Sequence, residues 1–182
     1  PKDTNDVLNL MEYSQKNSVP LLARGGGSSQ CGQTVGESVV LDYSKHQNKI
    51  LELNVEEKYV WVQPGVVLDH LNDYLKPHGL WFPVDVSTSS RATIGGMSAN
   101  NSCGSRSLYY GNMVHNVLAI EAILDDGSIF QFDQINKNYL ATKNNQDRLY
   151  KIIDKFIDVR QKVGSEIDAN WPTTQRRVGG YN

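Results

Sequence analysis

The stretch Pro20-Leu-Leu-Ala-Arg-Gly-Gly-Gly-Ser-Ser-Gln-Cys-Gly32 places a short apolar run directly before three consecutive glycines. This pattern is typical of a buried strand that feeds a tight loop. Glycine has no Cβ, so its backbone can adopt positive φ and bring amide groups within hydrogen-bonding distance of an anion. Ser28 and Ser29 add hydroxyl donors, and Arg24 would either bring charge near a pyrophosphate or lock the loop through an ion pair. By itself, the stretch also fits a turn that only reverses the chain.

A second glycine-containing stretch, residues 83–104, is crowded with small and hydroxylic side chains and carries Gly95-Gly96 directly after Ile94. Such a composition suits a backbone that presses against a large flat ligand. Neither stretch matches GxxxxGK[ST] or GxGxxG, so a mononucleotide P-loop and the common dinucleotide fingerprint are poorly supported. Ordering a glycine costs about 0.5 to 1 kcal/mol relative to alanine. Two such regions are therefore hard to explain as independent turns.

The hydrophobic periodicity predicts an α+β fold in two lobes. One parallel unit at the start is followed by antiparallel pairs, without the repeated strand–helix alternation of a doubly wound sheet. Asp125-Asp-Gly-Ser128 is a hairpin signal. Helices are expected over 4–16, over 67–76 and after Asp147, and strands over 19–23, 39–42, 50–54, 59–63, 117–124 and 129–132.

The composition excludes several classes of protein. The chain has 182 residues and a formal net charge of −2, so no bulk field would attract nucleic acid or an anionic membrane. No apolar run approaches the roughly 18 residues that span a bilayer, and no signal peptide is recognisable, so a cytoplasmic location is expected. Cys31 and Cys103 lack the spacing of a zinc or redox motif and are interpreted as free thiols, with no metal expected. Both ends of the sequence suggest a piece of a longer chain.

Six motifs occur in one order along the chain: Arg24-Gly-Gly-Gly-Ser-Ser-x-x-Gly32, Val62-Gln-Pro-Gly-Val66, Pro83-Val-Asp-Val-Ser87, Ala92-Thr-Ile-Gly-Gly96, Asn100-Asn-x-Cys-Gly104 and Tyr110-Gly111. Together they resemble the PCMH-type FAD-binding domain of the vanillyl-alcohol oxidase superfamily. Within it, the chain is similar to FAD-linked oxidases of the glycolate oxidase and D-lactate dehydrogenase group, including forms fused to an iron–sulfur region. The resemblance covers about residues 1–165.

The resemblance implies a residue set for FAD. A pyrophosphate would lie in the first loop, the ribityl chain and flavin ring against the second stretch, and adenine against the strand at 118–123. The residues implied are Arg24, Gly25, Gly26, Gly27, Ser28, Ser29, Gly32, Pro83, Ser87, Thr93, Ile94, Gly95, Gly96, Gly104, Ser105 and Ile123. Some family members bind FAD covalently through a histidine in the first loop. Here Ser28 and Ser29 stand at those positions, so non-covalent FAD is predicted.

The implied activity is the oxidation of a small 2-hydroxy acid, such as D-lactate or glycolate, by hydride transfer to FAD. No side chain is convincing as a catalytic base, and the piece alone is expected to be inactive. The implied subdomains are 1–58 and 59–165, with 166–182 leading to a substrate domain, and a membrane or electron-acceptor partner would act through other parts. Two alternatives stay open: a reductase of UDP-N-acetylenolpyruvoylglucosamine type that uses NADPH, and a non-catalytic nucleotide-binding module.

Three further features have more than one interpretation. Trp61 and Trp81 are expected in core packing, with flavin stacking as the alternative. Asp85 and Arg91 bracket a loop and fit either a structural ion pair or a contact to the cofactor. His115 is expected to be solvated or hydrogen-bonded rather than catalytic.

Overall fold

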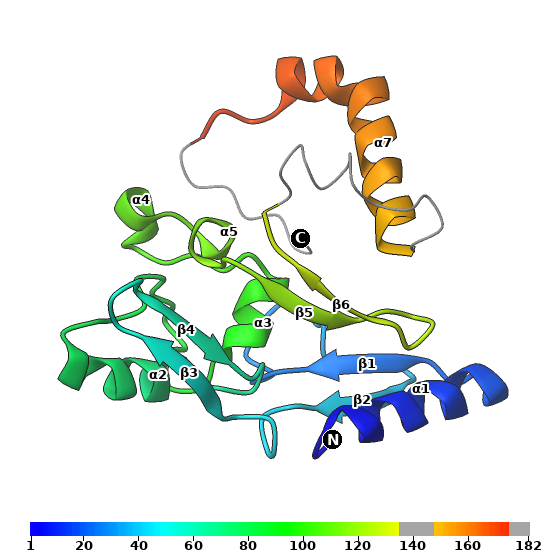
Figure 1. Ribbon diagram of the computed structural model, residues 1–182, viewed down its shortest axis with the longest axis horizontal. Coiled ribbons are helices and arrows are strands. Elements are labelled where there is room, and N and C mark those ends of the chain that lie inside the picture. Colours follow the sequence, from blue (N-terminus) through cyan, green and yellow to red (C-terminus); the bar gives the residue numbers. More distant parts are fainter. Residues whose placement is uncertain (135–147, 175–182) are drawn as a thin grey trace. The chain divides into compact units, whose positions relative to one another are not determined.

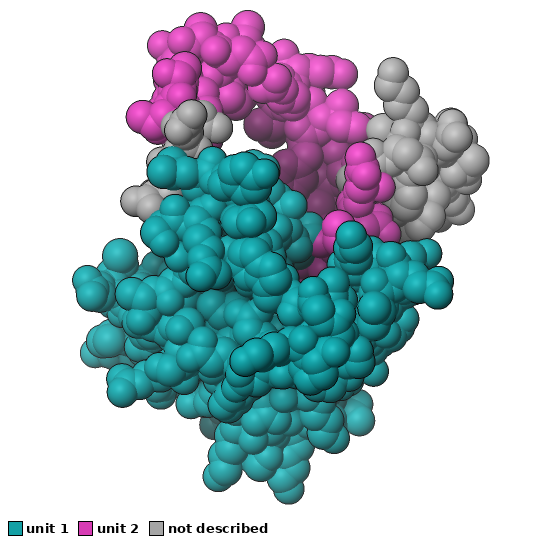
Figure 2. Space-filling model, turned by 90° about the vertical axis from the view of Figure 1, so that its left-hand side faces the viewer, with its two compact units in different colours: residues 1–117, 178–182 teal, residues 118–177 magenta. Residues whose placement is uncertain are grey.

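The computed structural model describes residues 1–134 and 148–174 and divides the chain into two compact units. Figure 2 colours unit 1, which contains residues 1–117, apart from unit 2, which begins at Leu118. Each unit mixes helices with small sheets, so the predicted α+β class is confirmed. The predicted subdomain boundary at residues 58 and 59 lies inside a hairpin of unit 1, and the division into FAD-binding subdomains stays a prediction.

Unit 1 contains four short strands, paired two by two, and helices before and after them (Figure 1). Its elements are α1 (Thr4–Asn17), β1 (Leu21–Arg24), β2 (Val39–Asp42), β3 (Ile50–Asn54), β4 (Tyr59–Val62), α2 (Leu68–Leu75), the 3₁₀ helix η1 (Lys76–His78), α3 (Ile94–Ala99), α4 (Ser107–Tyr110) and α5 (Met113–Asn116).

Helix α1 begins and ends where its capping residues predict. The Asp3 side chain accepts a hydrogen bond from the Asp6 amide, which satisfies one of the exposed amides of the first turn. Ser18 adopts the left-handed conformation, with φ of 53°, and its amide donates to the Ser14 carbonyl. The helix therefore ends shortly before the chain enters β1.

Strands β1 and β2 form the single parallel pair of the described residues, in a register that runs from Leu21 opposite Val39 to Arg24 opposite Asp42. The connection between them is the glycine-rich loop and contains no helix or strand. Both strands end at the same edge because parallel strands run in the same direction. The glycines that follow Arg24 therefore leave the sheet beside the end of β2.

A hydrophobic cluster joins α2 to the antiparallel pair β3–β4. Leu71 and Leu75 of α2 and the neighbouring Val66 are buried against side chains from both strands. Gly79 ends this segment with φ of 69°, as the His78-Gly79 pair predicts. Helix α2 thus fixes the position of the segment from Pro64 to Val67, and α3 is held against this segment.

A second cluster lies under the other glycine-rich stretch. Val84 and Ala92 from that stretch are buried together with Met97 of α3, Met113 of α5 and Leu68 of α2. The side chains of Phe82 and Ile94 pack against both clusters. The second stretch is therefore anchored by its apolar residues.

Unit 2 contains the hairpin β5 (Ile120–Ile123) and β6 (Ile129–Phe132) and the long helix α7 (Arg148–Asn170). The turn between the strands contains Gly127 at φ of 81°, so the predicted Asp-Gly hairpin is confirmed. Arg148, in the first turn of α7, forms ion pairs with Asp125 and Asp126 of that turn. The expected cap Asp147 lies outside the described residues.

Three short helices, α3, α4 and α5, were not predicted. Each has four to six residues, too few to show a hydrophobic period. Gly95 and Gly96 disfavour a helix at α3, but the Thr93 side chain accepts from the Gly96 amide and caps it. Tertiary packing of Met97 then outweighs the low helix propensity.

Replacing Leu71 with alanine should lower the free energy of unfolding by about 2 to 5 kcal/mol, because it removes a core side chain and leaves a cavity. Leu71 is 1% exposed, whereas Leu51 of β3 is 59% exposed and serves as the matched control. Leu51→Ala should change the free energy by less than about 1 kcal/mol. Urea unfolding of both variants measures the difference, and equal losses would contradict the assigned core.

Candidate FAD-binding site

The two glycine-rich stretches, far apart in the sequence, touch in the structure. A Cβ on Gly25 would lie 2.2 Å from the Thr93 Oγ1 atom, and a Cβ on Gly26 would lie 2.2 Å from the Arg91 carbonyl oxygen. Only glycine fits at either position without moving backbone or a buried threonine. In Figure 1, α3 accordingly lies beside the end of β1. The predicted site residues Gly25, Gly26, Thr93 and Gly96 are therefore brought together.

The start of α3 is fixed on its other side by the Pro64–Val67 segment. The Ile94 amide donates to the Val66 carbonyl at 2.8 Å, and the Gly95 amide donates to the Pro64 carbonyl at 2.9 Å. A Cβ on Gly95 would lie 2.5 Å from the Pro64 Cβ. Thr93 is 1% exposed, because it fills the space between Gly25 and Gly96. The distance between the two stretches is thus set by the buried Thr93 side chain and by the close approaches of Gly25 and Gly26.

The Arg24 side chain packs against the first loop at Gly27. Gly27 has φ of +64°, and a Cβ there would lie 2.7 Å from both Nε and Nη2 of Arg24. The Arg24 Nη1 atom lies 3.6 Å from Oδ2 of Asp42, and the buried Nε has no hydrogen-bond partner among the described residues. A hydrogen bond from the Ser44 hydroxyl is the main cause that lowers the pKa of Asp42, and Arg24 lowers it further. Asp42 therefore stays ionised and holds the guanidinium beneath Gly27.

Side chains connect the outer part of the first loop to the second stretch. The Thr88 hydroxyl lies 3.5 Å from that of Ser28, and the Gln33 Nε2 donates to the Asn100 Oδ1 at 2.9 Å. The Ser29 hydroxyl donates to Gln33 Oε1. Gln33 and Thr88 are not singled out by the sequence, and the motif that begins at Asn100 does not indicate its partner, because polar residues in loops give no local signal of long-range pairing.

Asp85 organises the start of α4. Its carboxylate accepts from the Ser105 hydroxyl at 2.6 Å and from the Arg106 amide at 2.9 Å. Partial burial alone would raise the pKa of Asp85, but these hydrogen bonds and the nearby Arg106 charge together lower it. Gly104 packs so closely that a Cβ would meet the Asp85 carbonyl at 1.6 Å. The partners of the Asp85 carboxylate are thus Ser105 and the Arg106 amide in place of the Arg91 of the expected ion pair, and a contact to the cofactor stays a prediction.

Other predicted site residues lie less close together. Gly32 has φ of +74° and open space around its missing Cβ, and Ser87 is exposed. Pro83 is half-buried beside Val84, and the Ile94 side chain packs in the core, which leaves its backbone for a ligand. Ile123 lies in β5 of unit 2.

One aromatic residue expected in the core is half-exposed instead. Trp81 is 43% exposed and packs edge-on against Tyr110, with ring centroids 5.1 Å apart. The Arg106 guanidinium lies 5.1 Å from the Trp81 ring centroid. Core packing is therefore wrong for Trp81. His115 accepts a hydrogen bond from the Asn112 amide on Nδ1 at 3.0 Å and caps α5, which confirms that it is hydrogen-bonded as expected.

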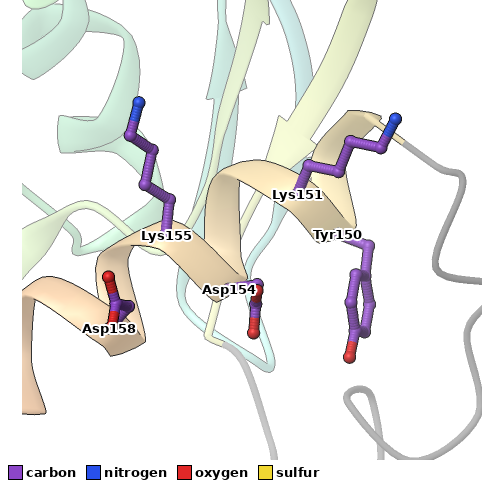
Figure 3. Close-up of a pocket in the computed structure, with 5 residues that line it drawn as sticks. All are labelled: Tyr150, Lys151, Asp154, Lys155 and Asp158. Carbon is purple, nitrogen blue, oxygen red and sulfur yellow. The ribbon is translucent and has the colours of Figure 1, made fainter.

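A hollow on α7 does not resemble a ligand site. Its lining is Tyr150, Lys151, Asp154, Lys155 and Asp158, all from one helix, and in Figure 3 the two lysines extend to one side while Tyr150 and Asp154 point to the other. Charges at this helical spacing are typical of a solvated face. Within residues 1–134 and 148–174, no cluster of three His, Cys, Asp or Glu side chains could hold a metal. No helix there is long and apolar enough to cross a bilayer.

A domain that closes two glycine-rich segments against each other at the end of a parallel strand pair has the features of a nucleotide-cofactor site. The FAD-binding domain family model matches residues 1–133, and the chain belongs to this family.

Two relatives show how the chain compares with longer proteins. It is 44% identical over 142 residues to the D-2-hydroxyglutarate dehydrogenase of Haemophilus influenzae, and the match covers 75% of this chain and 14% of that protein. It is 41% identical over 133 residues to the mitochondrial D-lactate dehydrogenase (cytochrome) of Kluyveromyces lactis, and the match covers 71% of this chain and 23% of that protein. The chain thus spans less than a quarter of either relative.

The fold is also that of a solved oxidase. The 6-hydroxy-D-nicotine oxidase of Arthrobacter nicotinovorans superposes with a TM-score of 0.65 and 18% identity, covering 72% of this chain and 28% of that one. The family identifies the chain as an FAD-binding domain, and the likeness to the oxidase shows the shared fold. Its residues fit the cofactor: a Cβ at Gly25, Gly26 or Gly27 would collide with Thr93, Arg91 or Arg24, so only glycine allows this loop conformation, and the buried Arg24 Nε lacks a partner among the described residues.

Replacing Gly26 with alanine should weaken FAD binding by about tenfold or more, a change of about 1.4 kcal/mol, because the new methyl must displace the Arg91 backbone. Gly36→Ala is the matched control, since its nearest neighbour would be the Ser38 hydroxyl at 3.8 Å. It should leave the affinity unchanged. Titration with FAD, followed by flavin fluorescence, measures both. Equal losses in the two variants would contradict the contact between the stretches.

Proposed function

We propose that the protein containing this chain oxidises a small 2-hydroxy acid by hydride transfer to FAD, and that this chain holds the FAD. The observation that carries the FAD site is the contact of Gly25 and Gly26 with the segment from Arg91 to Gly96. The substrate class is supported by the names of the two relatives, which are dehydrogenases of D-2-hydroxyglutarate and D-lactate.

The first loop is the proposed seat of the pyrophosphate. Its glycine backbone can turn amides towards an anion, and Ser28 adds a hydroxyl donor, while the Ser29 hydroxyl donates to Gln33 and lies at the same place. Arg24 contributes a positive charge held directly beneath Gly27. We assign pyrophosphate binding to residues 24–29. Gly32 lies farther along the loop and is not assigned a direct contact with the pyrophosphate.

The second stretch is the proposed support of the ribityl chain and ring. Gly95 packs against Pro64 and Gly96 against Thr93, which fixes the start of α3 beside the first loop, and Gly104 and Ser105 are fixed by Asp85. FAD supplies the hydride acceptor when it is bound, while the protein binds it and orients it. In this proposal, the side of the site that faces the ribityl chain and the flavin ring also includes Pro83, Ser87, Thr93 and Ile94. The adenine contact at Ile123 stays a prediction.

No described side chain of unit 1 is assigned as the base that takes the substrate proton. The substrate pocket and the electron acceptor are assigned to parts of the protein outside this chain, since it spans so little of its relatives. The cytoplasmic location and a membrane or acceptor partner stay predictions.

The intact protein should lose its visible flavin absorbance when mixed anaerobically with D-2-hydroxyglutarate, D-lactate or glycolate, because the bound flavin becomes reduced. Absorbance near the flavin maximum follows the reaction, and the L-enantiomers of the chiral acids serve as controls. A flavin that stays oxidised with all three acids but is reduced by NADPH would overturn the proposal in favour of an enolpyruvyl-sugar reductase.

The flavin should also be released intact by acid precipitation of the holoprotein, because neither Ser28 nor Ser29 offers the histidine to which a covalent flavin attaches. Flavin fluorescence in the supernatant and in the redissolved pellet measures the partition. Flavin that stays with the denatured protein would contradict non-covalent binding. ADP binding as tight as that of FAD, with no flavin in the purified protein, would instead favour a nucleotide-binding module.

A further inference from the structure

The side chains of Ser29, Gln33 and Asn100 join the two glycine-rich stretches where their backbones no longer touch. Gly25 and Gly26 press directly against residues 91–96, but the loop then moves away from that segment, and nothing fits closely around Gly32. At this outer part, the connection from Gln33 Nε2 to Asn100 Oδ1 is 2.9 Å long and spans 67 positions of sequence.

Gln33 uses both ends of its amide. Its Oε1 accepts from the Ser29 hydroxyl, and its Nε2 donates to Asn100. Ser29 also accepts from the Cys31 amide at 3.3 Å, so the turn at residues 29–33 closes on Gln33. A single half-buried side chain therefore orders the loop internally and ties it to the second stretch.

Asn100 is a fixed point for this connection. It is the C-cap of α3, where its amide donates to the Gly96 carbonyl at 3.2 Å. The adjacent Asn101 accepts the Val114 amide at 3.0 Å on its side chain, which ties the end of α3 to α5. The partner that Gln33 reaches is thus part of the packed scaffold, while Gln33 lies in a loop without helix or strand.

We infer that Ser29, Gln33 and Asn100 form a clasp that sets the separation of the two stretches and thereby the affinity for FAD. The inference rests on the proposed location of FAD between them. These are positioning residues: they act by holding the loop amides and the Ser29 hydroxyl in one arrangement before the cofactor binds. Without the clasp, part of the binding free energy would go into ordering the loop.

The clasp can be tested by exchanging donors and acceptors. In Gln33→Glu, the carboxylate still accepts from Ser29, and the Asn100 amide can turn to donate. In Asn100→Asp, the Gln33 Nε2 still donates to the new carboxylate. The double variant places two carboxylates opposite each other, so the connection is lost and replaced by repulsion.

FAD affinity and the rate of FAD dissociation are measured in the intact protein after the cofactor is removed. Each single variant should lose no more than about threefold in affinity, while the double variant should lose about tenfold or more beyond the product of the single effects. Hydrogen exchange of the 28–32 amides in the cofactor-free protein should be faster only in the double variant.

Gln30 provides the matched control, because it is exposed in the same loop and Gln30→Glu adds the same charge. The pair Gln30→Glu and Asn100→Asp should bind FAD as well as Asn100→Asp alone. Additive effects of Gln33→Glu and Asn100→Asp on affinity, or equal loss in the control pair, would overturn the clasp. A wild-type protein that does not bind FAD would overturn the proposed function itself, so the two failures are distinguishable.

Discussion

The close approach of Gly25 and Gly26 to the backbone between Arg91 and Gly96 is the constraint on which the rest of unit 1 depends. It requires that β1 end at one fixed place, because the glycines follow Arg24 directly. It also requires that α3 begin at one fixed place, and this is met by two backbone hydrogen bonds to the Pro64–Val67 segment. The parallel pair β1–β2 and the α2 cluster are thus the two supports that bring the stretches together.

Charge plays a local part in this arrangement. With a net charge of −2, the chain has no bulk attraction for a dianionic pyrophosphate, so any attraction must come from groups placed at the site. Arg24 is such a group, and Asp42 keeps it under Gly27 rather than extended into solvent. The ion pair is half-exposed and contributes little to stability, but it fixes the direction of a positive charge.

The sequence predicts the long elements and the glycine positions well, for physical reasons. Asp3 and His78-Gly79 mark helix ends through local capping, and the Asp-Gly turn of the β5–β6 hairpin needs only its neighbours. Helices α3 and α5 escape prediction because their stability comes from packing of Met97 and Met113 in the core, and α4 escapes it because four residues are too few to show a hydrophobic period. The pairing of Gln33 with Asn100 escapes prediction because a hydrogen bond across 67 positions leaves no trace in local composition. Trp81 shows the opposite error: its size suggests the core, but it pairs with Tyr110 and Arg106 at the surface.

The candidate site is built from backbone and small side chains, and this has a consequence for function. Glycine, serine and threonine can hold a pyrophosphate and a flavin edge, but they offer little to distinguish one 2-hydroxy acid from another. Under the proposed function, the choice of substrate therefore belongs to other parts of the protein, and the same cradle can serve relatives that are named for different acids. Selection on this chain would then act on the spacing of two loops, which is set by Thr93, by the glycines around it and by the clasp from Gln33 to Asn100.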